Sequence, residues 1–464
     1  MENLKVDFAV IGSGPAGQKA AIQASKLGKS VALIERDIVP GGYCLNSGTI
    51  PSKALREAII DLTRYNERSF YGSSCLTEVT IGDLTYRLNT VLEGERAILL
   101  RHFKKNRIHY LQGAACFQSP HRLFVKDNGK VLYALEAEKI LISTGSEPRN
   151  PLHVPFDDEV ILDSTRLLAI NRVPQTMIVL GGGVIGSEYA SFFAALGCRV
   201  YVLDKRGRLL TSLDAEIGTH LQVGLRDIGL EFLPRKVPVH ITRIGNKARV
   251  ECSDGTIYTA DVLLYALGRE AQVKGLQIEK AHVELNEDGF IPVNEYFQTN
   301  ISHIYAAGDV IGYPALASTS MEQGRLAARH AFGVSTHTFP TFFPIGIYTI
   351  PEISCCGYTE EELQTKGILY EVGRAYYYEI ARSHITGSSH LGMFKILFNR
   401  NTLEILGIHI LGRNATEVIH IGQVAMSFGA KLDYFVDQVF NYPTFAEGYR
   451  IAALNGLNKV RPGA

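Results

Sequence analysis

The chain is 464 residues long, and its 47 Lys and Arg side chains are balanced by 47 Asp and Glu side chains. This length predicts two or three domains, and the balanced charge argues against nucleic acid or an anionic membrane as the main partner, because both select basic faces. No apolar run approaches the about 18 residues that suggest a membrane span. A predicted strand begins almost at Met1, which leaves no room for a signal peptide.

The seven cysteines are scattered, and no CxxC pair suggests a zinc site or a disulfide framework. This pattern favours a reducing, cytoplasmic location. Cys355 and Cys356 are adjacent in a strand-like run, so we expect their side chains to pack on opposite faces. The basic run 101–105 is predicted to be a solvated helix face.

A nucleotide-binding fingerprint opens the chain. A strand over 6–11 precedes the glycine loop 12–17, a helix over 18–27 and a strand over 30–34. Glycines are expected where the loop turns, where pyrophosphate approaches, and where helix and strand pack. The terminal acid is placed to accept hydrogen bonds from a ribose, although an ordinary glycine-rich turn is the alternative. The predicted ligand residues are Gly12, Gly14, Pro15, Ala16, Gly17, Glu35 and Arg36.

The stretch 41–56 combines glycines, which let the backbone approach a ligand closely, with Lys53 near the start of a helix. A cation at that position is unfavourable unless a ligand or an acidic side chain neutralises its charge. Helices are predicted over most of 54–110, and a buried strand over 139–146. The candidate cofactor residues of the stretch are Gly42, Cys44, Gly48, Thr49, Ser52 and Lys53.

A second fingerprint begins at Met177, with a strand, the loop 181–186, a helix over 187–196 and a strand over 199–203. Two complete fingerprints imply two dinucleotides, or two halves of a redox relay, because no single coincidence explains an internal repeat. The predicted ligand residues of this repeat are Gly181, Gly183, Ile185, Gly186 and Glu188.

The end of the second repeat is chemically mixed. Asp204 should accept the ribose hydroxyls of NAD and repel a 2′-phosphate, whereas Lys205, Arg206 and Arg208 could hold that phosphate. The alternative is that these three cations are solvated loop charges.

The remaining segments return to the first repeat and then change character. A strand and turn over 263–269 is followed by 304–310, where Asp309 suits a ligand's hydroxyls or, alternatively, caps a helix. Beyond about residue 341, strands over 348–353, 394–398 and 405–410 and helices over 415–428 and 446–458 predict an α+β unit without a nucleotide site.

These motifs resemble the flavin- and nicotinamide-dependent disulfide reductases, and motif for motif they are most similar to the soluble pyridine nucleotide transhydrogenases. The resemblance implies an α/β fold with two Rossmann-like dinucleotide-binding domains and a C-terminal α+β dimerisation domain. Its domains would be 1–150 and 273–340 for FAD, 151–272 for NAD(P) and 341–464 for the homodimer interface. It also assigns further nucleotide contacts to Ala115, Thr144, Gly145, Gly268, Gly308, Asp309 and Ala317.

Two departures from the disulfide reductases point the same way. Thr49 stands where those enzymes carry the second redox cysteine, and Tyr442 stands in place of their acid/base histidine. A dithiol relay needs both thiols and a base, and Tyr, with an ordinary pKa near about 10, is a poor base at neutral pH. Hydride exchange between a nicotinamide and a flavin needs none of these groups.

We therefore expect an FAD-dependent enzyme that moves hydride from NADPH through flavin N5 to NAD⁺. One nicotinamide site would bind the two nucleotides in turn. The resemblance places Lys53 beside the flavin with Glu188 as its partner acid, although an interdomain ion pair without a catalytic role is the alternative. An NADH-dependent diaphorase or oxidase, favoured by Asp204, and a dihydrolipoamide dehydrogenase-like reductase are alternative enzymes. A nucleotide-binding sensor without turnover is the alternative of another class.

Overall fold

The computed structural model describes residues 1–63, 80–336, 338–388 and 391–460, so Cys75 lies outside the described residues. The chain forms two compact units. Unit 1 contains Met1–Ala54, Tyr86–Arg149 and Gly268–Pro340, and unit 2 contains Leu55–Thr85, Asn150–Leu267 and Thr341–Ala464. The first fingerprint therefore shares unit 1 with Asp309, and the second fingerprint shares unit 2 with the C-terminal segment.

Unit 1 is built on a sheet with the order β3-β2-β1-β6-β5-β4, in which β17 also pairs with β6. Strands β1, β2, β3, β6 and β17 run parallel where they pair, and β4–β5–β6 form an antiparallel extension. The strands of this sheet are β1 (Glu2–Ile11), β2 (Val31–Glu35), β3 (His109–Gln112), β4 (Ala114–Ser119), β5 (Arg122–Asp127), β6 (Lys130–Ile142) and β17 (Ile304–Ala306). A separate antiparallel pair is formed by β7 (Ser146–Pro148) and β16 (Arg269–Ala271).

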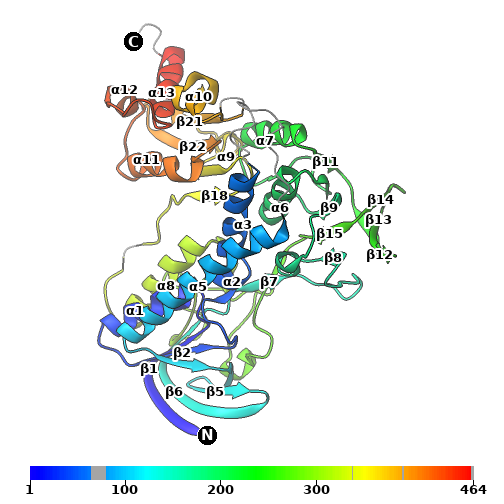
Figure 1. Ribbon diagram of the computed structural model, residues 1–464. Helices are drawn as coiled ribbons and strands as arrows, with labels where there is room; N and C mark the ends of the chain where they lie inside the picture. Colours follow the sequence, from blue (N-terminus) through cyan, green and yellow to red (C-terminus); the bar gives the residue numbers. More distant parts are fainter. Residues whose placement is uncertain (64–79, 337, 389–390, 461–464) are drawn as a thin grey trace. The chain divides into compact units, whose positions relative to one another are not determined.

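Both faces of this sheet are buried, as a parallel sheet requires. Phe8 and Val10 of β1 belong to one hydrophobic cluster, whereas Ala9 and Ile11 belong to another. Figure 1 shows helices packed over one face of the sheet. Helices α1 (Pro15–Lys26), α2 (Gly42–Asn46) and α8 (Ala317–Ala331) lie within unit 1. Helices α3 (Thr49–Leu62) and α5 (Ile81–Lys105) are divided between the units. Helix α3 begins in unit 1, and α5 begins in unit 2 and ends in unit 1.

The second fingerprint forms a parallel sheet with the order β11-β10-β9-β15-β8, flanked by the antiparallel sheet β12-β13-β14. These elements are β8 (Ile161–Leu162), β9 (Thr176–Leu180), α6 (Val184–Ala195), β10 (Arg199–Asp204), α7 (Ala215–Asp227), β11 (Leu230–Pro234), β12 (Pro238–Ile244), β13 (Lys247–Cys252), β14 (Ile257–Ala260) and β15 (Val262–Tyr265).

The C-terminal part of unit 2 is an antiparallel sheet with the order β18-β19-β22-β21-β20. Its elements are β18 (Ile345–Ile347), β19 (Ile353–Gly357), α9 (Glu360–Thr365), β20 (Tyr370–Tyr376), α10 (Ala381–Ile385), β21 (Met393–Asn399), β22 (Ile405–Leu411), α11 (Ala415–Ser427), α12 (Asp433–Asp437) and α13 (Glu447–Val460). Cys355 and Cys356 pack in different hydrophobic clusters, which confirms that they occupy opposite faces.

One predicted strand is wrong. The apolar run 348–353 is not a strand between Tyr348 and Glu352, because its backbone donors are used elsewhere. The N–H of Tyr348 donates to Glu188 Oε1 at 2.8 Å, and the N–H of Ile350 donates to Ser191 Oγ at 3.1 Å. Side chains of α6 therefore replace the partner strand.

Several boundaries also differ from the predictions. Helix α1 begins at Pro15 rather than residue 18, since proline is well suited to a first helical position. Helix α6 begins at Val184 rather than residue 187, and the strand predicted over 139–146 runs from Lys130 to Ile142. No helix among the described residues is both long enough and apolar enough to cross a membrane.

Candidate functional site

The first nucleotide loop is shaped by close backbone approaches. Gly12 has a φ of +101°, and a Cβ there would lie 2.4 Å from the carbonyl oxygen of Ser143. A Cβ on Gly17 would lie 1.9 Å from the carbonyl oxygen of Gly12, so α1 packs against the loop only without a side chain. Gly14, by contrast, faces open space, and no side chain caps α1. The helix amides are therefore available to an anion such as a pyrophosphate.

Ser13, in a variable position of the loop, joins three parts of the site. Its N–H and hydroxyl donate to Glu35 Oε2 at 2.9 and 2.6 Å, and its Oγ accepts from the N–H of Gly41 at 2.8 Å. The other oxygen of the buried Glu35 carboxylate accepts from the N–H of Asp37 at 3.0 Å. The carboxylate is thereby fixed at the end of β2, where a ribose is expected.

Asp309 is held by a second chain of contacts. Ser146 Oγ donates to Asp309 Oδ2 at 2.9 Å and accepts from Arg269 Nε at 2.8 Å. The Arg269 guanidinium also donates to the Ser146 carbonyl oxygen at 2.6 Å and lies over the Tyr43 ring, 4.2 Å from its centroid. The acid expected to bind a ligand's hydroxyls is thus oriented by residues that the sequence analysis did not single out.

The stretch with one cysteine lies in α2 and the start of α3. Burial raises the pKa of the Cys44 thiol, although a hydrogen bond with Thr49 and the nearby Lys53 ammonium act in the opposite direction. Lys53 Nζ donates to Ser52 Oγ at 3.3 Å, and Ser52 Oγ donates to the Thr49 carbonyl oxygen at 3.1 Å. Cys44 is free, and at neutral pH it is a thiol beside a hydroxyl, not a thiolate beside a second thiol.

The other predicted residues of unit 1 fall around these groups or at its edge. Gly42 approaches Gly14 so closely that a Cβ on Gly42 would lie 2.9 Å from Gly14 Cα. Arg36 is exposed and donates to Gln272 Oε1 at 3.4 Å. Pro15 and Ala16 lie in α1, Gly48 directly precedes α3, and Ala115 lies in β4. Thr144 and Gly145 follow β6, and Gly268 directly precedes β16. Gly308 precedes Asp309, and Ala317 begins α8.

Two buried polar atoms near these elements are further evidence that unit 1 binds a ligand. Thr144 Oγ1 and Arg269 Nη1 have no hydrogen-bond partner, although buried polar groups are ordinarily satisfied. Together with the open face of Gly14 and the uncapped α1, they fit a large polar ligand that carries phosphates and hydroxyls, as FAD does.

The second nucleotide loop repeats the geometry of the first. Gly181 has a φ of +107°, and a Cβ there would lie 2.6 Å from the Ala266 carbonyl oxygen. A Cβ on Gly186 would lie 1.9 Å from the Gly181 carbonyl oxygen, the same close approach as in the first repeat. Helix α6 has Gly183 at its N-cap, with no side-chain cap, and Ile185 lies in its first turn. A second dinucleotide therefore fits here.

The strand-end acid of this repeat is already paired. Asp204 Oδ2 accepts from the Gly182 N–H and from Arg206 Nη2, both at 2.6 Å, and Oδ1 accepts from Arg206 Nε at 2.9 Å. Burial alone would raise the pKa of Asp204, but the hydrogen bonds from Arg206 and Gly182 outweigh it and hold the pKa below its ordinary value. The ion pair neutralises the carboxylate where the adenosine ribose is expected.

We call residues 205–213 the ribose loop. Arg206 Nη2 lies 3.9 Å from the position of a Cβ on Gly183, beside the phosphate loop. Arg208 instead donates to the carbonyl oxygens of Leu213 at 2.9 Å and Thr211 at 3.2 Å, and Lys205 is exposed. Of the three predicted phosphate ligands, Arg206 lies nearest to the nucleotide loop.

Glu188 is buried on α6 and accepts from the backbone N–H of Tyr348. It belongs to unit 2, whereas Lys53 belongs to unit 1, so their pairing remains a prediction. Ser13, Ser146 and Arg269 are the residues that sequence reasoning missed. A serine between two fingerprint glycines was the only local signal, because the partners of the other two lie far along the chain.

Comparisons with known proteins show the family to which the chain belongs. The family profile described as pyridine nucleotide-disulphide oxidoreductase matches residues 6–324, and the dimerisation domain of the same family matches residues 343–453. A protein of Mycobacterium bovis named soluble pyridine nucleotide transhydrogenase is 46% identical over 459 residues, covering 98% of each chain. One of Yersinia pestis with the same name is 40% identical and covers 99% of each chain.

Among solved structures, the HOCl-induced flavoprotein disulfide reductase RclA from Escherichia coli, as its Cu(II) complex, has a TM-score of 0.88 at 27% identity. It covers 97% of this chain and 99% of its own. The predicted α/β fold class is confirmed by this likeness and by the two family domains. A family match over more than half of the sequence, with relatives of this identity and coverage, shows that the chain belongs to the pyridine nucleotide-disulphide oxidoreductases.

Proposed function

We propose that the protein is an FAD-dependent soluble transhydrogenase that moves a hydride from C4 of NADPH to C4 of NAD⁺. The reaction yields NADP⁺ and NADH and releases no proton. One observation carries the proposal. The chain retains both nucleotide-binding folds of a family whose active site is built on a thiol pair, but Thr49 stands where the second thiol is expected. Electrons delivered by one nicotinamide then have another nicotinamide, rather than a disulfide, as their acceptor. The names of the relatives support the same reaction.

Bound FAD supplies the group that holds two electrons between the two nucleotide visits. The chain's own residues bind and orient the reactants. Glu35 and Asp309 hold hydroxyls of one dinucleotide, and the amides of α1 hold its phosphates. Lys53 and Glu188, as a predicted pair, place a charge-balanced group between the cofactor and the nicotinamide site.

The Asp204–Arg206 pair explains how one site accepts both nucleotides. An unpaired carboxylate at the ribose would repel a 2′-phosphate, but here the approaching phosphate meets a neutral pair. Arg206 can turn toward a phosphate and leave Asp204 with the Gly182 N–H, or stay with Asp204 while the 2′-hydroxyl of NAD(H) binds. This favours NADP(H) use over a diaphorase restricted to NADH.

The decisive assay is anaerobic reduction of thio-NAD⁺ by NADPH with the purified, FAD-loaded protein. We expect turnover without added thiol or disulfide. Reduction of thio-NAD⁺ or a dye by NADH alone, with no NADPH activity, would replace the proposal with the diaphorase. Binding of both nucleotides without turnover would indicate a sensor.

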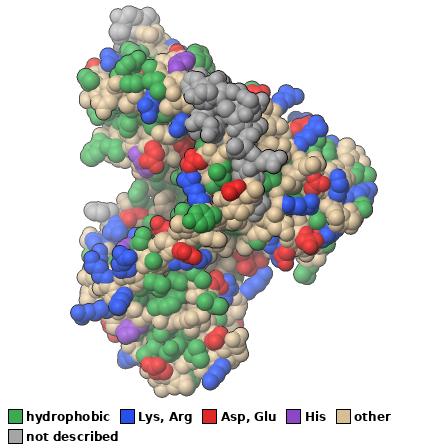
Figure 2. All heavy atoms as spheres, viewed as in Figure 1, with side chains coloured by type: hydrophobic (Ala, Val, Ile, Leu, Met, Phe, Trp, Pro, Cys, Tyr) green, Lys and Arg blue, Asp and Glu red, His purple; other side chains and the backbone are tan. Residues whose placement is uncertain are grey.

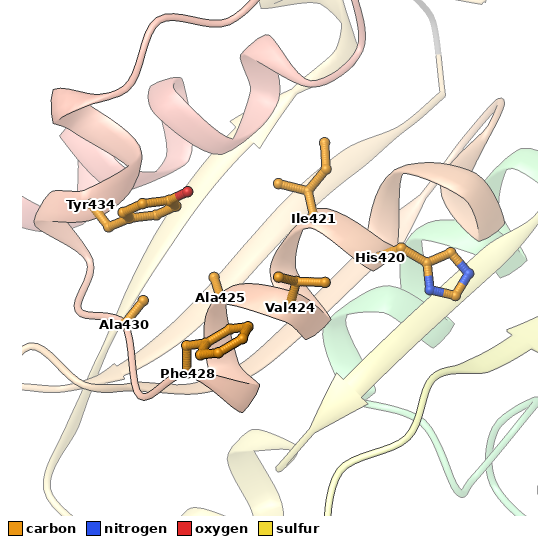
Figure 3. A pocket seen from close by; sticks show the side chains of 7 residues that line it. All are labelled: His420, Ile421, Val424, Ala425, Phe428, Ala430 and Tyr434. Atoms are coloured by element: carbon orange, nitrogen blue, oxygen red, sulfur yellow. The ribbon is translucent and has the colours of Figure 1, made fainter.

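We also propose that the protein is a homodimer, because the C-terminal part exposes an apolar surface. The scattered cysteines support the cytoplasmic location that we propose for it. Exposed Val424 of α11, Phe428 just after α11 and Tyr434 of α12 line a hollow of about 550 Å³. Figure 2 shows hydrophobic side chains at the surface in this part of unit 2, and Figure 3 shows these residues around the hollow with His420 at its end. A surface of this kind is typical of an interface.

We further propose that the segment from Tyr442 to Glu447 approaches the partner's cofactor, and the 72% exposure of Tyr442 supports this. Light scattering should give a dimer for the wild type and a monomer for Phe428→Asp. Tyr378→Asp is the matched control, because Tyr378 is an exposed aromatic residue outside the hollow. A wild-type protein that is monomeric at micromolar concentration and fully active would refute the dimer.

A further inference from the structure

The ribose loop ends at a buried acid that is held from outside the nucleotide-binding sheet. Asp214 is completely buried and caps α7, where its Oδ1 accepts from the N–H of Glu216 at 3.1 Å. The same oxygen accepts from Lys395 Nζ at 2.7 Å, and Oδ2 accepts from the N–H of Glu360 at 3.2 Å. Both of these donors come from the C-terminal part of unit 2. The position of Asp214, which directly follows the loop, therefore depends on that part of the chain.

Lys395 lies on β21 with a side chain that has no exposed surface. Its ammonium contacts Asp214 at 2.7 Å, Glu216 at 2.9 Å and a carboxylate oxygen of Glu360. The oxygens of these three acids lie within 4.8 Å of one another, an arrangement that could hold a metal ion. The Lys395 ammonium provides the cation instead. Burial alone would lower the pKa of Lys395, but its hydrogen bonds to Asp214 and Glu360 raise it, so the group stays charged.

Two further contacts fix the same end of the loop. Glu361 Oε1 accepts from the N–H of Ala215 at 3.0 Å and lies 3.6 Å from Arg208 Nη2. Arg374 of β20 pairs with both oxygens of Glu216, at 2.7 and 2.8 Å. Arg208 closes the loop on itself through Leu213 and Thr211, as described above.

The other end of the loop carries the group that selects the nucleotide. Arg206 Nη1 donates to Thr211 Oγ1 at 3.1 Å, so the guanidinium beside Asp204 is braced by a residue near the anchored end. Asp204 itself lies at the end of β10 and, besides its bonds from Arg206, accepts from the Gly182 N–H, which lies outside the loop. Loss of the anchor should therefore disturb Arg206 more than Asp204.

We propose that Lys395 and Glu361 are positioning residues for nucleotide choice, because they fix the end of the ribose loop that keeps Arg206 beside the adenosine ribose. This inference rests on the proposed use of NADP(H). A 2′-phosphate takes its extra contacts from the loop, whereas the ribose hydroxyls of NAD(H) take theirs from the strand end. A loosened anchor thus weakens the phosphorylated nucleotide selectively.

The test uses the FAD-loaded protein and two probes, adenosine 2′,5′-bisphosphate and 5′-AMP, with dissociation constants measured by calorimetry. The variants are Lys395→Met, which removes the buried cation, and Glu361→Ala, whose side chain is 44% exposed and whose loss the fold should tolerate. Lys459→Met is the matched control, since Lys459 pairs with the carbonyl oxygen of Val372 in the same part of the chain but does not contact the loop.

We expect Lys395→Met to weaken the bisphosphate by about three- to thirtyfold and Glu361→Ala to act in the same direction by a smaller factor. The affinity for 5′-AMP should stay within about twofold, and the control should change neither constant. KM for NADPH should rise with kcat little changed. A purely structural defect would lower the number of binding sites and leave the ratio of the two constants unchanged.

The inference is overturned if both variants keep the wild-type ratio of the two affinities within about twofold. If Lys395→Met does not fold, Glu361→Ala decides by the same criterion. A wild-type protein that prefers the bisphosphate, with variants that keep this preference, overturns only the positioning role. A wild-type protein that binds 5′-AMP but not the bisphosphate overturns the use of NADP(H) and this inference with it.

Discussion

Replacing Ser146 by alanine should weaken FAD binding although Ser146 has no assigned contact with the cofactor. The change removes the hydrogen bond to Asp309 Oδ2 at 2.9 Å and the one from Arg269 Nε at 2.8 Å. It leaves the bond from Arg269 to the Ser146 carbonyl oxygen. Hydrogen bonds to charged groups are each worth about 1.5–3 kcal/mol.

Asp309 and Arg269 are only partly buried, so water replaces part of this loss and a net cost of about 1–2 kcal/mol is reasonable. The FAD dissociation constant of Ser146→Ala should therefore rise by about five- to thirtyfold. The assay is a titration of the deflavinated protein with FAD, followed by flavin fluorescence. Asp309→Asn removes the negative charge of the side chain that is predicted to bind FAD. This variant should raise the FAD dissociation constant by at least as much.

Ser30→Ala is the matched control, because the Ser30 hydroxyl also donates to a carboxylate, Asp7 Oδ2 at 2.8 Å, but at an exposed position. This variant should bind FAD like the wild type. If Ser146→Ala binds FAD as tightly as the wild type while Asp309→Asn does not, the chain from Arg269 through Ser146 does not orient Asp309. If neither variant changes the affinity, Asp309 is not a ligand.

Three other predictions use separate readouts. Cys44→Ser should keep transhydrogenase activity within about fivefold, because the raised pKa leaves Cys44 as a thiol; a hundredfold loss with FAD bound would contradict this. Arg206→Ala should lower kcat/KM for NADPH by about tenfold and that for NADH much less, whereas the exposed Arg226→Ala should change neither; equal losses would mean that Arg206 does not recognise the phosphate. Burial lowers the pKa of His409 below 6.5, so the unfolded chain binds the proton first and stability falls as pH drops below that value. His409→Gln should flatten this fall in the melting temperature between pH 7 and about 5, and an unchanged pH profile would refute it.

The glycine positions could be predicted because no residue with a side chain fits at these positions of the fingerprint. Gly12 and Gly181 need positive φ, and any side chain at Gly17 or Gly186 would overlap a carbonyl oxygen, so the pattern itself encodes the geometry. The C-terminal strands over 394–398 and 405–410 could be predicted from their apolar runs instead. The positive φ angles and the approaches of Gly17 to Gly12 and Gly186 to Gly181 arise within one strand–loop–helix unit, which is why they are visible in sequence.

What escaped prediction depends on partners that are far apart in the chain. Ser146 joins residues 163 and 123 positions away, and no pattern around it indicates this. The run 348–353 has the composition of a strand, but Glu188 and Ser191 of α6 take its backbone donors. The ion pair between Asp204 and Arg206 depends on how the chain folds back after β10, which the two residue types alone do not show.

The Lys395 contacts have a consequence for how the protein is made. Asp214 and Lys395 are 181 residues apart, and the chain leaves the ribosome N-terminus first. At synthesis rates of about 5–20 residues per second, Asp214 emerges roughly 10–40 seconds before its cation. During that interval the second nucleotide-binding sheet can form, but its ribose loop still lacks the anchor. The nucleotide-selecting part of this enzyme is therefore finished only when the last domain folds, and nascent chains released before β21 would carry an unanchored loop with three basic side chains.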